Sequence, residues 1–274
     1  SRPDVVATWS DEDVARRWLI ASRLIHSKNG RTVQPVTEEE IAAKLAYPGG
    51  DELRSRLSSV SYFMKTLCEY IARRANREDG THGTFFESRF QCKQLASESA
   101  ILACGMYVDL NQIRASEATT PETSRHTSAY DRIQGRLQRA AGSSGVHSKP
   151  PPDGWLCELE VDERAAAYQG AAPSSTPWRG SDKGLLPVRL EEYLQLLDWS
   201  GRALVAGKPG AIPSELAPIL ERLGINQRKW LQLVSRFERL FSHVVGTASQ
   251  LMERAAQAGR HWYHGRAQCA EAFG

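Results

Sequence analysis

The sequence lacks several features that would place it in a membrane or in a disulfide-rich class. No apolar run approaches the roughly 20 residues that cross a bilayer, and the mean hydropathy is −0.45. The first residues do not show the basic, apolar and small-residue regions of a signal peptide. The five cysteines are widely spread, and no pair has the CxxC spacing of a zinc or redox motif. We therefore expect a cytoplasmic protein without a membrane partner, whose thiols are buried or idle.

The net charge is small, at +3 for 274 residues, but its distribution is uneven. From residue 54 to 93 there are eight Lys/Arg against four Asp/Glu, and from 202 to 266 there are ten against four. Residues 1–53 carry seven basic and nine acidic residues. Two basic regions in a nearly neutral chain favour an anionic partner such as nucleic acid. Solvated helix faces explain the same charges equally well.

Helical periodicity dominates the chain and predicts a mainly α protein with one strand. The expected helices cover 11–25, 38–45, 51–77, 97–114, 128–139, 189–205, 213–223, 226–241, 248–258 and 260–271. The segment TFFESRFQCKQL, at 84–95, alternates in part and predicts a strand. Stretches rich in Pro, Gly and Ser at 142–152 and 173–184 are typical of linkers. We therefore divide the chain into a first domain at 1–115, a connection at 116–185 and a helical region at 186–274.

The segment 84–115 holds the residues best suited to chemistry. Tyr107 and Asn111 are four apart on one predicted helix, so a phenol and a carboxamide should share a face. Either side chain could instead have a structural role, with Tyr107 closing the core and Asn111 capping a backbone group. Glu87 and Arg89 should share one face of the predicted strand, as a functional pair or as a simple ion pair.

A basic rim and a group of aromatic residues complete the candidate set. The cationic candidates for phosphate contacts are Arg73, Arg74, Arg77, Arg89, Lys93 and Arg114. The first three lie at a predicted helix C-terminus, where the helix dipole alone favours cations. Phe85, Phe86 and Phe90 could stack on unpaired bases or could pack in the core.

The residues 103–115, ACGMYVDLNQIRA, resemble the AYVDLNPIRAG signature of bacterial single-tyrosine transposases of the HUH type, the REP-associated group. The preceding GTFFESRFQCKQL resembles that group's GxxWEGRFKS segment, and LLPVRLEEYLQLLDWSGR with GAIPSELAPILERLGI resembles the tail of its long members. The chain departs from the pattern at Gln112, where proline is common, and at Phe86, where tryptophan is common.

The resemblance implies a DNA transposase that cleaves and joins single-stranded DNA through a 5′-phosphotyrosine. By this match Tyr107 is the catalytic nucleophile, and Asn111 is the third ligand of a divalent metal, Mg²⁺ or Mn²⁺. The implied partner is hairpin-containing single-stranded DNA, contacted by Arg73, Arg74, Arg77, Glu87, Arg89, Lys93 and Arg114. The implied fold is α+β and predominantly α, the remnant of a ferredoxin-like nuclease domain followed by a C-terminal helical bundle. Monomers and homodimers both occur in the family.

The family's other two metal ligands come from a His-hydrophobic-His strand, and no His-x-His occurs in this sequence. In the family that strand precedes a segment like SRPDVVATWSDEDVARRWL, with which this chain begins. We therefore expect a truncated transposase that is inactive alone. The divalent metal is expected in the complete enzyme, and this fragment could be without it. The alternative is a non-catalytic nucleic-acid-binding or regulatory protein derived from such a transposase. A helical protein-interaction module is a third reading, which the basic regions disfavour.

Overall fold

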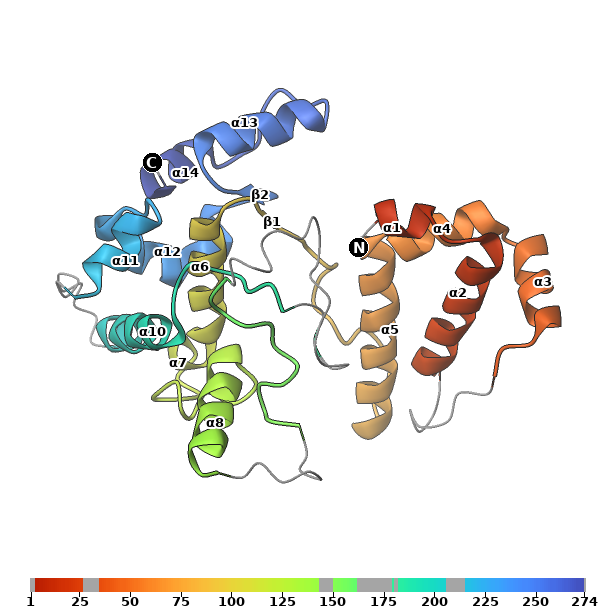
Figure 1. Ribbon diagram of the computed structural model, residues 1–274, viewed down its shortest axis with the longest axis horizontal. Coiled ribbons are helices and arrows are strands. Elements are labelled where there is room, and N and C mark those ends of the chain that lie inside the picture. Colours follow the sequence, from red (N-terminus) through yellow and green to blue (C-terminus); the bar gives the residue numbers. More distant parts are fainter. Residues whose placement is uncertain are drawn as a thin grey trace. The chain divides into compact units, whose positions relative to one another are not determined.

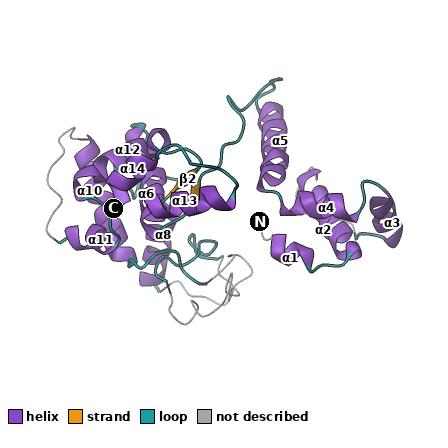
Figure 2. Ribbon diagram, turned by 90° about the horizontal axis from the view of Figure 1, so that it is seen from above, coloured by secondary structure: helices purple, strands orange, loops and turns teal. Residues whose placement is uncertain are grey.

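A computed structural model describes residues 3–26, 35–142, 150–161, 179, 182–205 and 215–273, with side chains described up to residue 22 in the first range. The described chain is predominantly helical, which confirms the predicted predominance of α-helix (Figures 1 and 2). It forms two compact units, residues 1–92 and 93–274. None of the described helices is both long enough and apolar enough to cross a membrane.

The described part of the first unit contains five helices: α1 (Pro3–Ala7), α2 (Asp11–His26), α3 (Glu38–Ala46), α4 (Gly50–Ser58) and α5 (Val60–Glu78). Its small core consists of Val14, Ala15, Ile41 and Leu53. Thr37 begins α3 with a capping box in which Glu40 reciprocates, as the sequence predicts. The unit therefore owes its core to α2, α3 and α4, and α5 has no fully buried residue.

The single helix predicted over 51–77 is wrong, because the chain breaks between α4 and α5. Ser59 leaves helical geometry, with φ −92° and ψ 116°, and its hydroxyl accepts a hydrogen bond from the Tyr62 amide at 3.1 Å. Serine competes well for this N-cap role. Leu53 is buried in the core, while Val60 and Ile71 are 40% and 38% exposed.

The second unit is built around α6 (Glu98–Asp109), α10 (Leu190–Val205) and α12 (Trp230–Leu240). Its other elements are β1 (Gln94–Leu95), α7 (Asn111–Arg114), α8 (Ser128–Ala140), α11 (Ala217–Arg222), the 3₁₀ turn η1 (Gln227–Lys229), β2 (Val244–Val245), α13 (Ala248–Gln257) and α14 (Arg266–Phe273). Figure 1 shows α6 beside α12, and Met106, Trp230 and Leu233 are among the residues buried in this core.

The strand predicted over 84–95 is wrong except for its last two residues. Gln94 and Leu95 pair in parallel with Val244 and Val245, and this is the one sheet in the described residues. Residues 84–93 form an irregular segment, and its rings Phe85, Phe86 and Phe90 are 38–44% exposed rather than packed in the core. Alternation does not produce a strand there because no described partner strand lies alongside to accept its backbone hydrogen bonds.

The compact units do not follow the predicted domain limits. The helix that carries Tyr107 packs with the C-terminal helices, so 93–115 belongs to the second unit. Most of both predicted linker stretches, at 143–149, 173–178 and 180–181, lies outside the described residues, as do positions 213–214 of the predicted helix 213–223.

Candidate functional site

Tyr107 lies on α6, which begins at the N-cap Ser97, whose hydroxyl accepts from the Ala100 amide at 3.1 Å. The Tyr107 ring is half-buried, with its centroid 6.0 Å from that of Phe237 on α12. Its hydroxyl donates to Glu238 Oε2 at 3.1 Å. The phenol is therefore neither sealed in the core nor pointing freely into solvent, because a carboxylate from the C-terminal region holds its oxygen.

Arg114, at the end of α7, connects the predicted site residues. Its Cζ lies 4.0 Å from the centroid of the Tyr107 ring, a cation–π geometry. Its Nη2 donates to Asn111 Oδ1 at 2.9 Å and to the Tyr107 carbonyl at 3.3 Å, and Nη1 donates to the Ser235 carbonyl at 3.0 Å. One guanidinium thus joins the tyrosine, the asparagine and α12.

The prediction that Tyr107 and Asn111 share a side of the helix agrees with this geometry, because both contact Arg114. Leu110 links α6 to α7 with near-helical dihedral angles, φ −84° and ψ −1°, so the one-turn spacing is preserved. Glu238 is a further member of the cluster that sequence reasoning missed. Its position 131 residues from Tyr107 left no local signal.

Asn111, the metal ligand that the resemblance implies, already has a partner for its amide oxygen within the chain. The amide oxygen that would bind the ion accepts a hydrogen bond from the Arg114 guanidinium, and a cation in that place repels a second one. No group of three His, Cys, Asp or Glu side chains among the described residues is arranged to hold a metal ion. The metal centre that the resemblance implies stays a prediction for the complete enzyme.

Lys93 has a different environment from that of a phosphate contact. Its ammonium group donates to the carbonyl of Glu238 at 2.7 Å and to the carbonyl of Phe241, so it caps the C-terminal end of α12. A cation is favoured at this end of a helix by the unpaired carbonyls and by the helix dipole. The structure therefore gives Lys93 an internal role.

The remaining predicted residues lie in the first unit. Arg73 and Arg74 form ion pairs with Glu69 and with Glu78, the latter at 2.8 Å, along the exposed surface of α5. Arg77 lines, with Arg73, a shallow cavity of about 500 Å³ at the end of α5. Glu87 and Arg89 lie in the exposed segment after α5. The second unit thus contains Tyr107, Asn111, Arg114 and Lys93, and the first unit contains the other candidates.

Asp109 is a second residue that sequence reasoning missed, and its role is structural. Its carboxylate is 1% exposed and accepts from the Ser128 amide at 3.0 Å, the Ser128 hydroxyl, and the Tyr193 hydroxyl at 2.7 Å. An acidic residue in the last turn of an apolar helix is the available sequence signal, because the helix dipole disfavours it there without a partner. Asp109 thereby joins α6 to α8 and α10.

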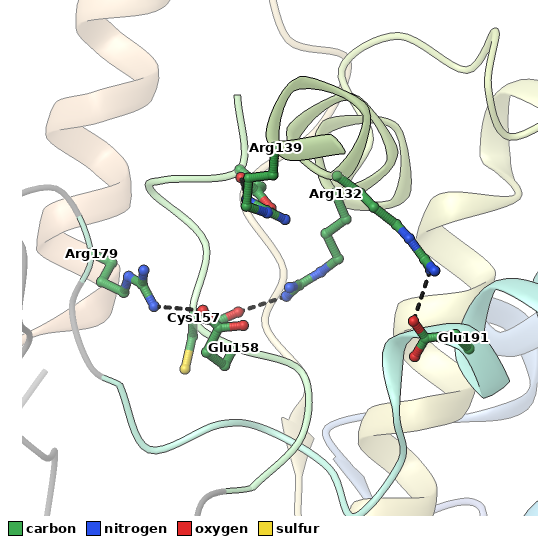
Figure 3. A network of polar contacts seen from close by, with 8 residues as sticks. Arg132, Arg139, Cys157, Glu158, Arg179 and Glu191 are labelled. Carbon is green, nitrogen blue, oxygen red and sulfur yellow. Dashed lines mark hydrogen bonds and ion pairs between the residues drawn. The ribbon is translucent and has the colours of Figure 1, made fainter. Parts of the chain in front are cut away.

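A basic helix is a natural candidate for nucleic-acid binding, but the arginines of α8 form bonds with other groups of the same chain (Figure 3). Arg132 donates to the Cys157 carbonyl at 2.7 Å, and Arg136 pairs with Glu191 at 2.9 Å. Arg139 makes a bidentate pair with Asp153, at 2.9 and 2.7 Å. These contacts attach segment 150–161 and α10 to α8.

Comparisons with protein-family models, with curated proteins and with solved structures find no match to this chain.

Proposed function

We propose that this chain is the tyrosine-bearing part of a single-tyrosine DNA transposase and that it binds single-stranded DNA. One observation carries the proposal: a half-buried phenol, the carboxamide one helical turn beyond it and a guanidinium meet in one cluster. In this proposal residues 1–115 derive from a ferredoxin-like nuclease domain, and residues 186–274 form its helical extension. Cleavage then requires the His-x-His strand that this sequence does not contain.

The cluster would supply the nucleophile, a proton acceptor and one cation for attack by the phenol. Tyr107 Oη would form the bond to phosphorus as the bond from phosphorus to the 3′ oxygen breaks, which leaves a 5′-phosphotyrosine and, after protonation, a 3′-hydroxyl. The phenol proton has an acceptor in place, since Glu238 Oε2 lies 3.1 Å away. The guanidinium of Arg114 supplies positive charge beside the ring, where a phosphate would approach.

A second candidate function is a non-catalytic nucleic-acid-binding or regulatory protein of the same origin. The observation that favours it is the occupation of the cluster by its own members, with Asn111 Oδ1 on Arg114 and Tyr107 Oη on Glu238. The polar groups of the cluster satisfy one another, so the arrangement is stable without a substrate or a catalytic role. The two candidates agree on binding of single-stranded DNA and differ on a covalent intermediate.

The experiment that separates them uses hairpin-containing single-stranded DNA labelled at its 3′ end, on the fragment that the 5′-phosphotyrosine retains, with Mg²⁺ or Mn²⁺ present. We expect the chain alone to bind without a covalent adduct. A version preceded by a His-hydrophobic-His strand of the kind found in the family should form an adduct that survives denaturing electrophoresis. Tyr107→Phe should abolish that adduct and retain binding, while the control Tyr130→Phe should keep both.

Each other outcome has a definite meaning. An adduct that persists in Tyr107→Phe contradicts the nucleophile assignment. Binding with no adduct in the longer version, or an upstream gene sequence without the histidine strand, favours the non-catalytic candidate. No binding to single-stranded DNA at any salt concentration contradicts both candidates.

A further inference from the structure

A mixed apolar and basic pocket of about 680 Å³ lies within the first unit, between α5 and the segment that follows it. Met64 and Cys68 line it from one face of α5, and Phe86 and Phe90 line it from the opposite side. Lys65 and Arg89 complete the rim with two serine hydroxyls. The volume is within the range of small-molecule sites, which run from about 300 to 1,000 Å³.

Local contacts hold the pocket's two sides together. The chain turns back after α5 through Gly80 and Gly83, whose φ angles of 63° and 114° strongly favour glycine. Asn76 fixes this turn, because its carbonyl accepts from the Thr81 amide at 2.8 Å and its Nδ2 donates to the Gly83 carbonyl at 2.9 Å. The aromatic segment is thereby returned along the helix it has just left.

The charges of the lining are of one sign. Lys65 and Arg89 are exposed, no carboxylate lines the pocket, and neither cation has an ion pair within the described residues. Elsewhere in the described chain most arginines of α5 and α8 are already paired with acids. Partly exposed rings beside unpaired cations are the combination that single-strand binders use, with rings for the base faces and cations for the phosphates.

We propose that this pocket takes an unpaired base of single-stranded DNA, stacked on Phe86 and Phe90, with the flanking phosphates on Lys65 and Arg89. The inference rests on the proposed function for the choice of nucleic acid, and it names the part of the first unit that holds the strand. It involves none of the residues of the Tyr107 cluster.

The test measures binding of the full chain to fluorescein-labelled oligothymidine by anisotropy. Phe90→Ala should weaken binding about tenfold, as the loss of one base stack does, while Phe63→Ala should stay close to wild type. Phe63 is the matched control because it lies on α5, is 62% exposed and does not line the pocket. Phe90 is itself 39% exposed, so its truncation should leave the fold intact, as a thermal melt would verify.

Two further arms identify the ligand. An abasic oligonucleotide should bind more weakly than oligothymidine and should be insensitive to Phe90→Ala. Arg89→Gln should lower the slope of log affinity against log salt by about 0.7, whereas the exposed Arg202→Gln should not. Thymidine monophosphate should compete poorly with the labelled strand. If it competes as strongly as unlabelled oligothymidine does, the pocket binds free nucleotides and the proposal is overturned.

The inference and the proposed function can fail separately. Equal affinities of Phe90→Ala and Phe63→Ala for a strand that the wild type binds would overturn the pocket alone. Pocket-dependent binding without any role of Tyr107 in an adduct would leave the pocket standing and remove the transposase chemistry. Absence of wild-type binding would overturn both.

Discussion

At the scale of single residues, the buried contact between Asp109 and Tyr193 carries the clearest electrostatic consequence. Tyr193 is 3% exposed and donates its hydroxyl proton to Asp109 Oδ2 at 2.7 Å. Burial, and then the neighbouring Asp109 charge, raise the pKa of Tyr193 well above its ordinary value. The phenol therefore stays protonated in the folded protein at a pH where the unfolded chain would release the proton.

The sign of the pH dependence follows from that raised pKa. Its contribution to stability is present in full below the ordinary phenol pKa of about 10 and is lost as the pH rises above it. We expect the free energy of unfolding, measured with urea, to fall above about pH 10 in the wild type. Tyr193→Phe should be less stable by about 1 kcal/mol at neutral pH, because Asp109 loses a donor, and its alkaline decline should be shallower. Parallel curves for the two proteins would contradict the assignment.

At the scale of elements, the packing of α8 against segment 150–161 depends on a helix glycine. A Cβ atom at Gly135 would lie 2.1 Å from Asp153 Oδ1, which is far inside contact distance. Asp153 also forms the bidentate pair with Arg139, and its side chain is 12% exposed. The glycine is therefore required by the close approach of a carboxylate to the helix.

This predicts an unusual pair of effects for Gly135→Ala. Alanine normally stabilises a helix by about 1 kcal/mol relative to glycine, but here we expect a net loss of about 1–2 kcal/mol, because the Asp153 pair must move. In the Asp153→Ala background the obstacle is absent, and the same substitution should be neutral or stabilising. Chemical denaturation of the four proteins of this cycle measures the coupling. A stabilising Gly135→Ala in the wild type would contradict the packing.

A predicted helix or strand forms only where its surroundings support it, and periodicity alone is not sufficient. The helix predicted over 97–114 is observed, as α6 and α7, because its apolar face is buried against α12. The partial alternation of 84–95 yields only two strand residues, since a strand requires a neighbour that periodicity does not supply. The break at Ser59 likewise interrupts a predicted helix because one hydroxyl caps a new start.

At the scale of the whole molecule, the described chain has two separate hydrophobic cores. Leu53 is fully buried in the first and Met106 in the second. Because each core is contained in its own unit, the two should open locally and independently.

Matched core truncations test this independence. Leu53→Ala and Met106→Ala should each cost about 2–5 kcal/mol, confined to the unit that contains the change. Hydrogen exchange followed by mass spectrometry should show faster exchange in peptides from 1–92 for Leu53→Ala and in peptides from 93–274 for Met106→Ala. Equal acceleration along the whole chain in either variant would contradict two separate cores.

The sequence by itself determined the helical class, most helix positions and the sharing of one side of a helix by Tyr107 and Asn111. These depend on the 3.6-residue period and on capping residues, which are local properties. Only the tertiary structure decided that Glu238 holds the Tyr107 hydroxyl, that Lys93 caps α12 and that Arg114 occupies the Asn111 amide. The first two contacts join residues more than 100 positions apart, so no local pattern encodes them. The third joins residues three apart on α7, where helical spacing permits the contact but does not require it.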